Sequence, residues 1–224
     1  MDNESLLSQL AKCVEFGKVN KEATYPPDMQ GKEGADELTS QALEMGIKPS
    51  RILDEALIAA MDRVGEKFSR KKIFVPQMLV AAKAMNAAME HLKPYFQSGE
   101  VKRKGTFIIG TVSGDLHDIG KNLVAMIVEG AGWEVIDLGV DVSAAKFKAA
   151  IAERPDAVIG LSALLTTTMH NMKTTVGEIK QDFPDTTLLI GGAPVNEDFR
   201  KEIGAHGYSP DPQGAVSYLN SLAA

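Results

Sequence analysis

Apolar residues in the first part of the chain recur at the three- and four-residue intervals of amphipathic helices. Four such patterns occur, at residues 6–14, 35–45, 49–64 and 76–95. Gly46 ends the second pattern, and Pro49 stands where a new helix begins, a position at which the missing N–H of proline does no harm. Four helices with short connections predict a small bundle over residues 1–96.

After residue 104 the apolar residues form short continuous runs instead, which is typical of parallel strands buried on both faces. The runs lie at residues 106–112, 133–138, 157–161 and 187–190, with a weaker fifth run at 205–208. Helical patterns alternate with them, at residues 119–129, 144–152, 169–181, 196–203 and 214–222. The alternation predicts an α/β fold class, in which the N-terminal four-helix bundle precedes a doubly wound, Rossmann-like sheet of five parallel strands. Residues 97–104 are polar and are the predicted linker, so the second domain would span residues 105–224.

The charge and the cysteine content limit which partners the protein can bind and in which compartment it is expected. Among 224 residues there are 24 Lys and Arg against 30 Asp and Glu, and the formal net charge is −6. An acidic chain without a dense basic stripe argues against nucleic-acid binding, which depends on neutralising phosphates. Cys13 is the single cysteine, which excludes an internal disulfide and fits a reducing compartment. No apolar stretch approaches the ~20 residues that cross a bilayer, and residues 1–5 are too polar for a secretory signal, so we expect a cytoplasmic protein without a membrane partner.

The loop after the first predicted strand carries the chemistry. Ligands of open parallel sheets bind beyond the carboxyl ends of the strands. Residues 113–122 lack the glycine patterns of dinucleotide and phosphate loops, but they hold Asp115 and His117 two positions apart. Such a pair can act as a general base, as a metal ligand with its supporting carboxylate, or as a structural part of the loop, and the last use is the commonest for an isolated pair.

A zinc site is not indicated, because it needs at least three protein ligands. The other histidines are His91, His170 and His206, and the cysteine lies in the helical half. A single histidine suits a metal that brings its own equatorial ligands, as a metal in a macrocycle does.

A longer string resembles a known signature. Gly114-Asp115-Leu116-His117-Asp118-Ile119-Gly120 is similar to the Asp-x-His-x-x-Gly signature of cobalamin-binding domains. That signature continues with Ser-x-Leu and Gly-Gly, which match Ser162-Ala163-Leu164 and Gly191-Gly192 in the same order. Phe68 and residues 73–78 resemble the helical cap of methyl-carrying corrinoid proteins and of cobalamin-dependent methionine synthase. The resemblance extends from about residue 10 to the C-terminus.

The resemblance implies that His117 is the lower axial ligand of cobalt, in the base-off/His-on form of the cofactor. Asp115 would hydrogen-bond the other imidazole nitrogen, and Thr168 would extend this relay. The displaced nucleotide tail would enter a slot beside the sheet, approached closely at Gly120 and kept open by the Gly-Gly pair. The implied cofactor-binding residues are Gly114, Asp115, Leu116, His117, Asp118, Ile119, Gly120, Ser162, Leu164, Thr166, Thr168, Gly191, Gly192, Ala193, Tyr208, Asp211 and Pro212.

Phe68, Val75 and Met78 would cover the upper face of the corrin and exclude water from the methyl–cobalt bond. By spacing alone, a methionine stripe that includes Met78 is more often part of a helical core.

The resemblance implies a corrinoid subunit of a multi-component methyltransferase system, with cobalamin or another corrinoid as the cofactor and cobalt as the metal. The subunit would not be catalytic alone, since the bundle and the sheet domain account for the chain and leave no barrel-sized segment for a substrate. One partner would methylate the cobalt from a methylamine, methanol, an O-methyl compound or a betaine, and a second would pass the methyl group to a thiol or a tetrahydropterin. A reductive activase is a further expected partner. The alternatives are a cobalamin-dependent regulator or sensor, the small subunit of an adenosylcobalamin mutase, and passive cobalamin storage.

Overall fold

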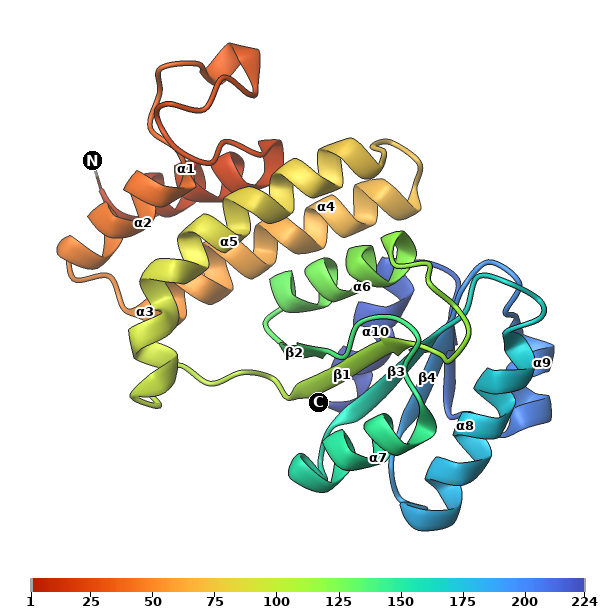
Figure 1. Ribbon diagram of the computed structural model, residues 1–224. Coiled ribbons are helices and arrows are strands. Elements are labelled where there is room, and N and C mark those ends of the chain that lie inside the picture. The colour runs from red at the N-terminus through yellow and green to blue at the C-terminus, as the bar shows by residue number, and fades with distance from the viewer. Residues whose placement is uncertain (1, 224) are drawn as a thin grey trace. The chain divides into compact units, whose positions relative to one another are not determined.

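The computed structural model describes residues 2–223, which form two compact units (Figure 1). The first unit runs to Arg103 and includes Gly130–Gly132. The second comprises Lys104–Glu129 and the residues from Trp133 onward. The assignment of separate domains on either side of the predicted linker stays a prediction.

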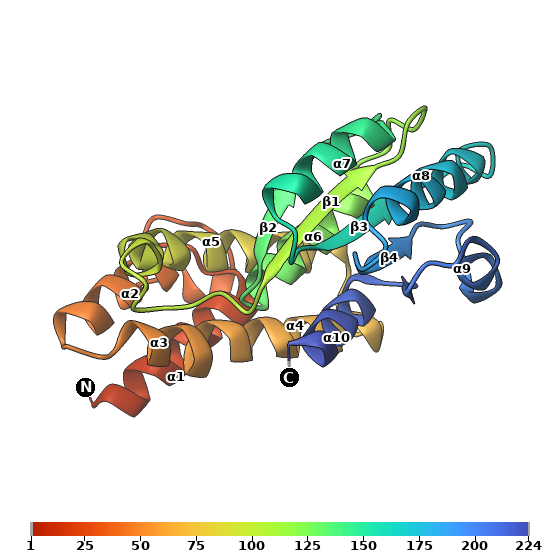
Figure 2. The same ribbon diagram turned by 90° about the horizontal axis from the view of Figure 1, so that it is seen from below.

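The first unit is helical, as the periodicity predicts (Figure 2). Its elements are α1 (Asn3–Phe16), η1 (Pro27–Met29), α2 (Ala35–Glu44), α3 (Pro49–Arg51), η2 (Ile52–Ile58), α4 (Ala59–Ser69) and α5 (Val75–Gln97). The helix predicted from Pro49 is continuous but contains the π-helical stretch η2 in its middle. Leu6, Leu10 and Val14 on α1 are completely buried, and α1 packs against α2, α4 and α5. Burial of this apolar stripe is what stabilises the bundle.

The second unit contains the predicted parallel sheet. Its elements are β1 (Thr106–Thr111), α6 (Ile119–Gly130), β2 (Glu134–Asp137), α7 (Ala144–Glu153), β3 (Val158–Ser162), α8 (Met169–Asp182), β4 (Leu188–Gly191), α9 (Glu197–Ile203), β5 (Gly207–Ser209) and α10 (Pro212–Leu222). The strands lie in the order β2-β1-β3-β4-β5, and every pairing is parallel. The predicted doubly wound α/β fold is therefore confirmed. The last strand begins two residues later than predicted, because the N–H of Ala205 still closes the end of α9 on the carbonyl of Arg200.

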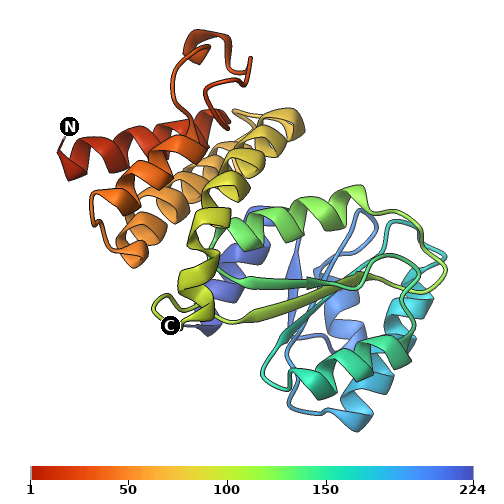
Figure 3. The same cartoon turned by 60° about the vertical axis from the view of Figure 1, so that its left-hand side comes forward.

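The alternation of side chains along each strand separates two faces of the sheet. Ile108, Ile159 and Leu188 point to one face, where they form a packed core with residues of α7 and α8. Phe107 and Leu189 occupy the alternate positions and line a cavity together with residues of α6 and α10. These two helices cover the side of the sheet opposite α7 and α8 (Figures 1 and 3). The first face is filled, and the second contains the cavity described below.

The strand register brings four loops to one edge of the sheet. Thr111 is paired with Ser162, Ser162 with Gly191, and Gly191 with Ser209. Each of these residues is the last of its strand, so the loops after β1, β3, β4 and β5 begin side by side. This edge is where ligands of doubly wound sheets bind, at the point where the strand order reverses between β1 and β3.

Candidate functional site

His117 lies in the loop between β1 and α6 and is held by Asp115. Oδ1 of Asp115 accepts a hydrogen bond of 3.0 Å from the backbone N–H of His117, and lies 2.8 Å from Nδ1 of the same residue. The Asp115 side chain is completely buried, whereas that of His117 is 50% exposed. Because Nδ1 donates to an anionic acceptor, Nε2 keeps the lone pair that a metal requires.

The other carboxylate oxygen of Asp115 is also occupied. Oδ2 accepts hydrogen bonds of 2.7 Å from the backbone N–H of Leu164 and of 2.7 Å from the hydroxyl of Thr168. Burial alone would raise the pKa of Asp115, but the hydrogen bonds from Leu164, His117 and Thr168 hold that pKa well below its ordinary value. The carboxylate therefore stays anionic at neutral pH and keeps the imidazole oriented.

A cavity of about 600 Å³ opens beside His117. Its buried wall is apolar and includes Phe107 and Ile109 from β1, Leu123 from α6 and Ala215 from α10. The predicted site residues that line the cavity are Leu116, His117, Asp118, Ile119, Gly120, Ser162, Leu164, Gly191, Gly192, Ala193, Tyr208, Asp211 and Pro212. Residues from four loops and two helices thus line one apolar cavity, which has polar residues at its edge.

Two glycines shape this cavity in different ways. The backbone of Gly192 has φ 125°, and a Cβ atom there would lie 1.8 Å from the carbonyl oxygen of Ala163, so no other residue fits. Gly120 lies in the first turn of α6, where an added Cβ atom would have no neighbouring atom within 4 Å, and it leaves open space beside the cavity. The first glycine is required by the fold, and the predicted role of the second in admitting a ligand stays a prediction.

Four of the predicted cofactor-binding residues lie outside the cavity lining. Asp115 and Thr168 lie behind the lining, and Asp115 hydrogen-bonds two residues that do line the cavity, His117 and Leu164. Gly114 belongs to the turn that precedes Asp115. Thr166 is exposed, and its predicted contact with a buried tail stays a prediction.

The predicted cap residues lie in the helical unit. Phe68 near the end of α4 and Val75 at the start of α5 are half-buried, and Met78 is 1% exposed. Their role as a corrin cover stays a prediction. Phe74 and Leu79, which the sequence pattern did not single out, are 65% and 38% exposed.

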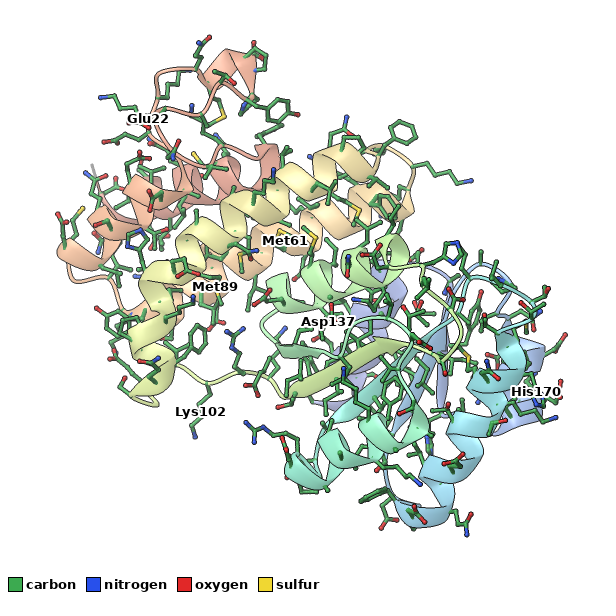
Figure 4. All side chains as sticks on the ribbon, in the orientation of Figure 1. Glu22, Met61, Met89, Lys102, Asp137 and His170 are labelled. Carbon is green, nitrogen blue, oxygen red and sulfur yellow. The ribbon has the colours of Figure 1, made fainter. Side chains whose placement is uncertain are left out.

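Lys121 is the main polar residue of the cavity that sequence reasoning missed. Its side chain is 2% exposed, and its ammonium group pairs with Asp137 at the end of β2 (labelled in Figure 4) and lies 2.6 Å from Oδ1 of Asn122. The charge is thus neutralised within the protein. The apolar lining residues Phe107, Ile109 and Leu189 could have been found from strand alternation, because they are alternate positions on the predicted strands.

The other histidines are used elsewhere. His91 bonds Oδ1 of Asp36 at 2.5 Å, and Nδ1 of His206 accepts from the backbone N–H of Leu188 at 3.0 Å. His170 is exposed near the start of α8 (labelled in Figure 4). Across residues 2–223 no group of three or more His, Cys, Asp or Glu side chains is arranged to hold a metal ion. Nor does this part of the chain contain a helix long and apolar enough to span a membrane.

Comparisons with known proteins place the chain in a family. Residues 105–217 match the family model described as a B12 binding domain, and residues 31–93 match a second B12 binding domain model. Trimethylamine corrinoid protein 1 of Methanosarcina acetivorans is 37% identical over 195 residues, which cover 85% of this chain and 90% of that protein. Dimethylamine corrinoid protein 1 of the same organism is 35% identical over 227 aligned positions, 100% of both chains.

Two solved structures resemble the whole chain. The methanol:cobalamin methyltransferase complex of Methanosarcina barkeri contains a chain that matches with a TM-score of 0.82 and 29% identity, covering 98% of this chain and 80% of that one. A cobalamin-binding protein of Desulfitobacterium hafniense matches with a TM-score of 0.73 and 28% identity over 98% of both chains.

Fold and site together define a doubly wound α/β protein that presents a carboxylate-supported histidine beside an apolar cavity. The chain belongs to the B12-binding family and, within it, to the corrinoid proteins. The predicted cofactor class, a corrinoid, is thereby confirmed. The residues present fit such a cofactor, because Nε2 of His117 is the available nitrogen and the adjoining cavity is large and apolar.

Proposed function

We propose that the chain holds a corrinoid through His117 and carries a methyl group on its cobalt between two partner methyltransferases. The observation that carries this proposal is the half-exposed His117 imidazole, whose Nδ1 is held by a buried carboxylate and whose Nε2 is the available ligand atom. The bound cofactor supplies the methyl-transfer chemistry, and the protein supplies its position and axial donor.

The base-off/His-on arrangement is supported by the cavity. If an imidazole of the protein takes the lower axial position, the nucleotide tail of the cofactor must leave it and be accommodated elsewhere. The cavity of about 600 Å³ begins at His117 and extends to Phe107, near the start of β1. Phe107 precedes the end of β1 by four residues, or roughly 13 Å at the rise of a strand, so the cavity has the depth to take an aromatic group.

The class of methyl donor follows from the relatives. The names of these proteins refer to trimethylamine, dimethylamine and methanol, which are all small compounds that can donate a methyl group. We infer a substrate-specific methyltransferase as the first partner, as the structure of the methanol:cobalamin methyltransferase complex suggests. A second methyltransferase that uses a thiol or a tetrahydropterin, and a reductive activase, complete the proposed system.

Reconstitution tests the axial ligand. The protein, labelled with ¹⁵N, is incubated with unlabelled hydroxocobalamin, desalted and reduced to Co(II). Coordination by a protein nitrogen is read from the EPR spectrum, because ¹⁵N splits each line into a doublet whereas the nitrogen of the cofactor's own base splits it into a triplet. We expect one axial nitrogen in the wild type, its loss in His117→Ala, and its retention in the control His170→Ala, which changes an exposed histidine outside the cavity. An unchanged spectrum in His117→Ala would exclude this residue as the ligand.

A pair of glycine variants tests the cavity. Gly120 and Gly177 are both helical with no neighbouring atom within 4 Å of an added Cβ, but only Gly120 borders the cavity. Gly120→Leu should fold and lose most cofactor after desalting, whereas Gly177→Leu should keep it. Equal occupancy in the two variants would contradict the proposed tail site.

Methyl transfer distinguishes the proposal from its rivals. The reconstituted protein is reduced to Co(I) and mixed with candidate methyltransferases and their methylated amines or methanol, and formation of methyl–cobalt is followed in the visible spectrum. Methylation by one of these pairs supports the carrier. Preferential retention of adenosylcobalamin with DNA binding would favour a regulator, and carbon-skeleton isomerisation with a barrel subunit would favour a mutase.

A further inference from the structure

The turn that precedes Asp115 is held by a residue from another loop. Asp141 follows β2, and its Oδ1 accepts hydrogen bonds of 2.7 Å from the N–H of Gly114 and of 3.1 Å from the hydroxyl of Ser113. Its own N–H donates to the carbonyl of Asp115 at 3.0 Å. One residue therefore bonds three successive residues of the turn, from Ser113 to Asp115.

The backbone of Asp141 is unusual. Its φ is 51°, in the left-handed region that residues with a side chain rarely adopt, although Asp and Asn do so more often than most. In this conformation both the backbone N–H and the carboxylate of Asp141 reach the same turn. The hydrogen bonds from Gly114 and then Ser113 also lower the pKa of Asp141, so the acceptor is anionic at neutral pH.

Helix α8, which comes later in the chain, also holds this turn. Nδ2 of Asn171 on α8 donates a hydrogen bond of 2.7 Å to the carbonyl of Ser113. Gly114 has φ 80°, and a Cβ atom there would lie 3.2 Å from Nδ2 of Asn171. The Ser113–Gly114 turn is thus held both by the loop between β2 and α7 and by helix α8. These contacts are separate from those that the Asp115 side chain makes with Thr168 and His117.

We propose that Asp141 is a positioning residue for the axial histidine. It does not line the cavity, so it acts through the turn, by fixing the backbone from which the Asp115 carboxylate reaches Nδ1 of His117. This inference rests on the proposed function, since it assumes that His117 binds cobalt. Loss of the Asp141 carboxylate would let the turn relax and would weaken the orientation of the imidazole.

The variants separate the carboxylate from the backbone conformation. Asp141→Gly permits positive φ but removes the acceptor, and Asp141→Asn keeps an oxygen acceptor and tolerates positive φ. Lys71→Ala is the matched control, because Lys71 is an exposed residue with φ 57° in the helical unit. Asn171→Ala removes the second contact to the turn and gives a measurement that does not depend on the folding of any Asp141 variant.

The measurement is the ratio of His-bound to His-free Co(II) in the reconstituted full chain at a fixed neutral pH, read from the nitrogen splitting in EPR. We expect at least a threefold fall in this ratio for Asp141→Gly and a fall in Asn171→Ala, with Asp141→Asn and Lys71→Ala close to the wild type. A wild-type ratio in Asp141→Gly, or an equal fall in Asp141→Asn, would overturn the inference. Absence of protein nitrogen coordination in the wild type itself would instead refute the proposed axial ligand.

Discussion

The hydroxyl of Thr168 donates a hydrogen bond of 2.7 Å to Oδ2 of Asp115, the carboxylate oxygen that His117 does not use. Thr168 is 4% exposed and does not line the cavity. The three side chains therefore form a line from a buried hydroxyl, through a buried carboxylate, to a half-exposed imidazole. Thr168 therefore acts on the imidazole through Asp115, although its hydroxyl also lies 2.9 Å from the carbonyl oxygen of Leu165.

Thr168→Val should weaken axial coordination while leaving the cofactor bound. Valine has the shape of threonine but lacks the hydroxyl, so Asp115 loses one donor and holds Nδ1 of His117 less firmly. Changes to the partners of a metal-binding histidine commonly cost about 10–100-fold, and we expect the low end of that range for the ratio of His-bound to His-free Co(II). Thr168→Ser keeps the hydroxyl and is the control. Identical ratios in the two variants would show that the hydroxyl plays no part.

Asp115 should also make the stability of the cofactor-free protein depend on acid pH. Its pKa is lowered in the folded state, so its contribution is present above the ordinary pKa of about 4 and is lost as the pH falls towards the folded value. The free energies of unfolding of the wild type and of Asp115→Asn are measured in urea from pH 6 to pH 3. The wild type should be more stable by roughly 2 kcal/mol at pH 6, and this difference should narrow towards pH 3. A gap that does not change over this range would mean that the carboxylate is not preferentially ionised in the folded state.

The elements could be predicted from the sequence because local pattern and burial agree. The helical stripe of Leu6 and Leu10 and the apolar run at residues 106–112 each have a period that only one type of element satisfies. The ends of elements were less predictable. Ala205 was assigned to a strand by its apolar character, but its N–H is used by the preceding helix. The π-helical stretch at Ile52–Ile58 was also missed, because its apolar spacing does not differ from that of an ordinary α-helix.

The candidate site was predictable where its residues lie within one motif. Asp115 and His117 are two positions apart, and their contact follows from the turn between them. Asp141 and Asn171 were missed because they reach the same turn from positions more than 20 residues away, and each is an ordinary polar loop or helix residue by composition. Only the strand order, which places β1 between β2 and β3, brings them together.

Gly192→Ala should strongly destabilise the protein. The backbone of Gly192 has a positive φ, which residues with a side chain rarely adopt. An added Cβ would also lie 1.8 Å from the backbone oxygen of Ala163, and a backbone atom cannot move aside as a flexible side chain can. We expect a loss of about 2–4 kcal/mol in the free energy of unfolding. Gly177→Ala is the control, since it lies within α8 with no atom within 4 Å and should gain roughly 0.5–1 kcal/mol. Urea unfolding measures both, and a loss below about 1 kcal/mol in Gly192→Ala would mean that the loop after β4 can move away.

Cys13 should react with thiol reagents far more slowly in the folded protein than in the unfolded chain. The residue is 2% exposed, and burial raises the pKa of its thiol to about 11, although the positive charge of Lys18 opposes this rise. At pH 8 only about one thousandth of such a thiol is the reactive thiolate, compared with roughly a quarter for an ordinary cysteine.

The pH dependence of this reaction distinguishes a raised pKa from simple inaccessibility. Cys13 is the only cysteine, so the absorbance change with an aromatic disulfide reagent reports on it alone. If the folded thiol reacts directly, its rate should keep rising about tenfold per pH unit beyond pH 9, where the rate for the urea-unfolded chain has already levelled off near its ordinary pKa of about 8.5. A folded-state rate that levels off at the same pH as the unfolded one would mean that the reagent meets Cys13 only after the helical unit has opened, and that the buried thiolate itself is never the reacting species.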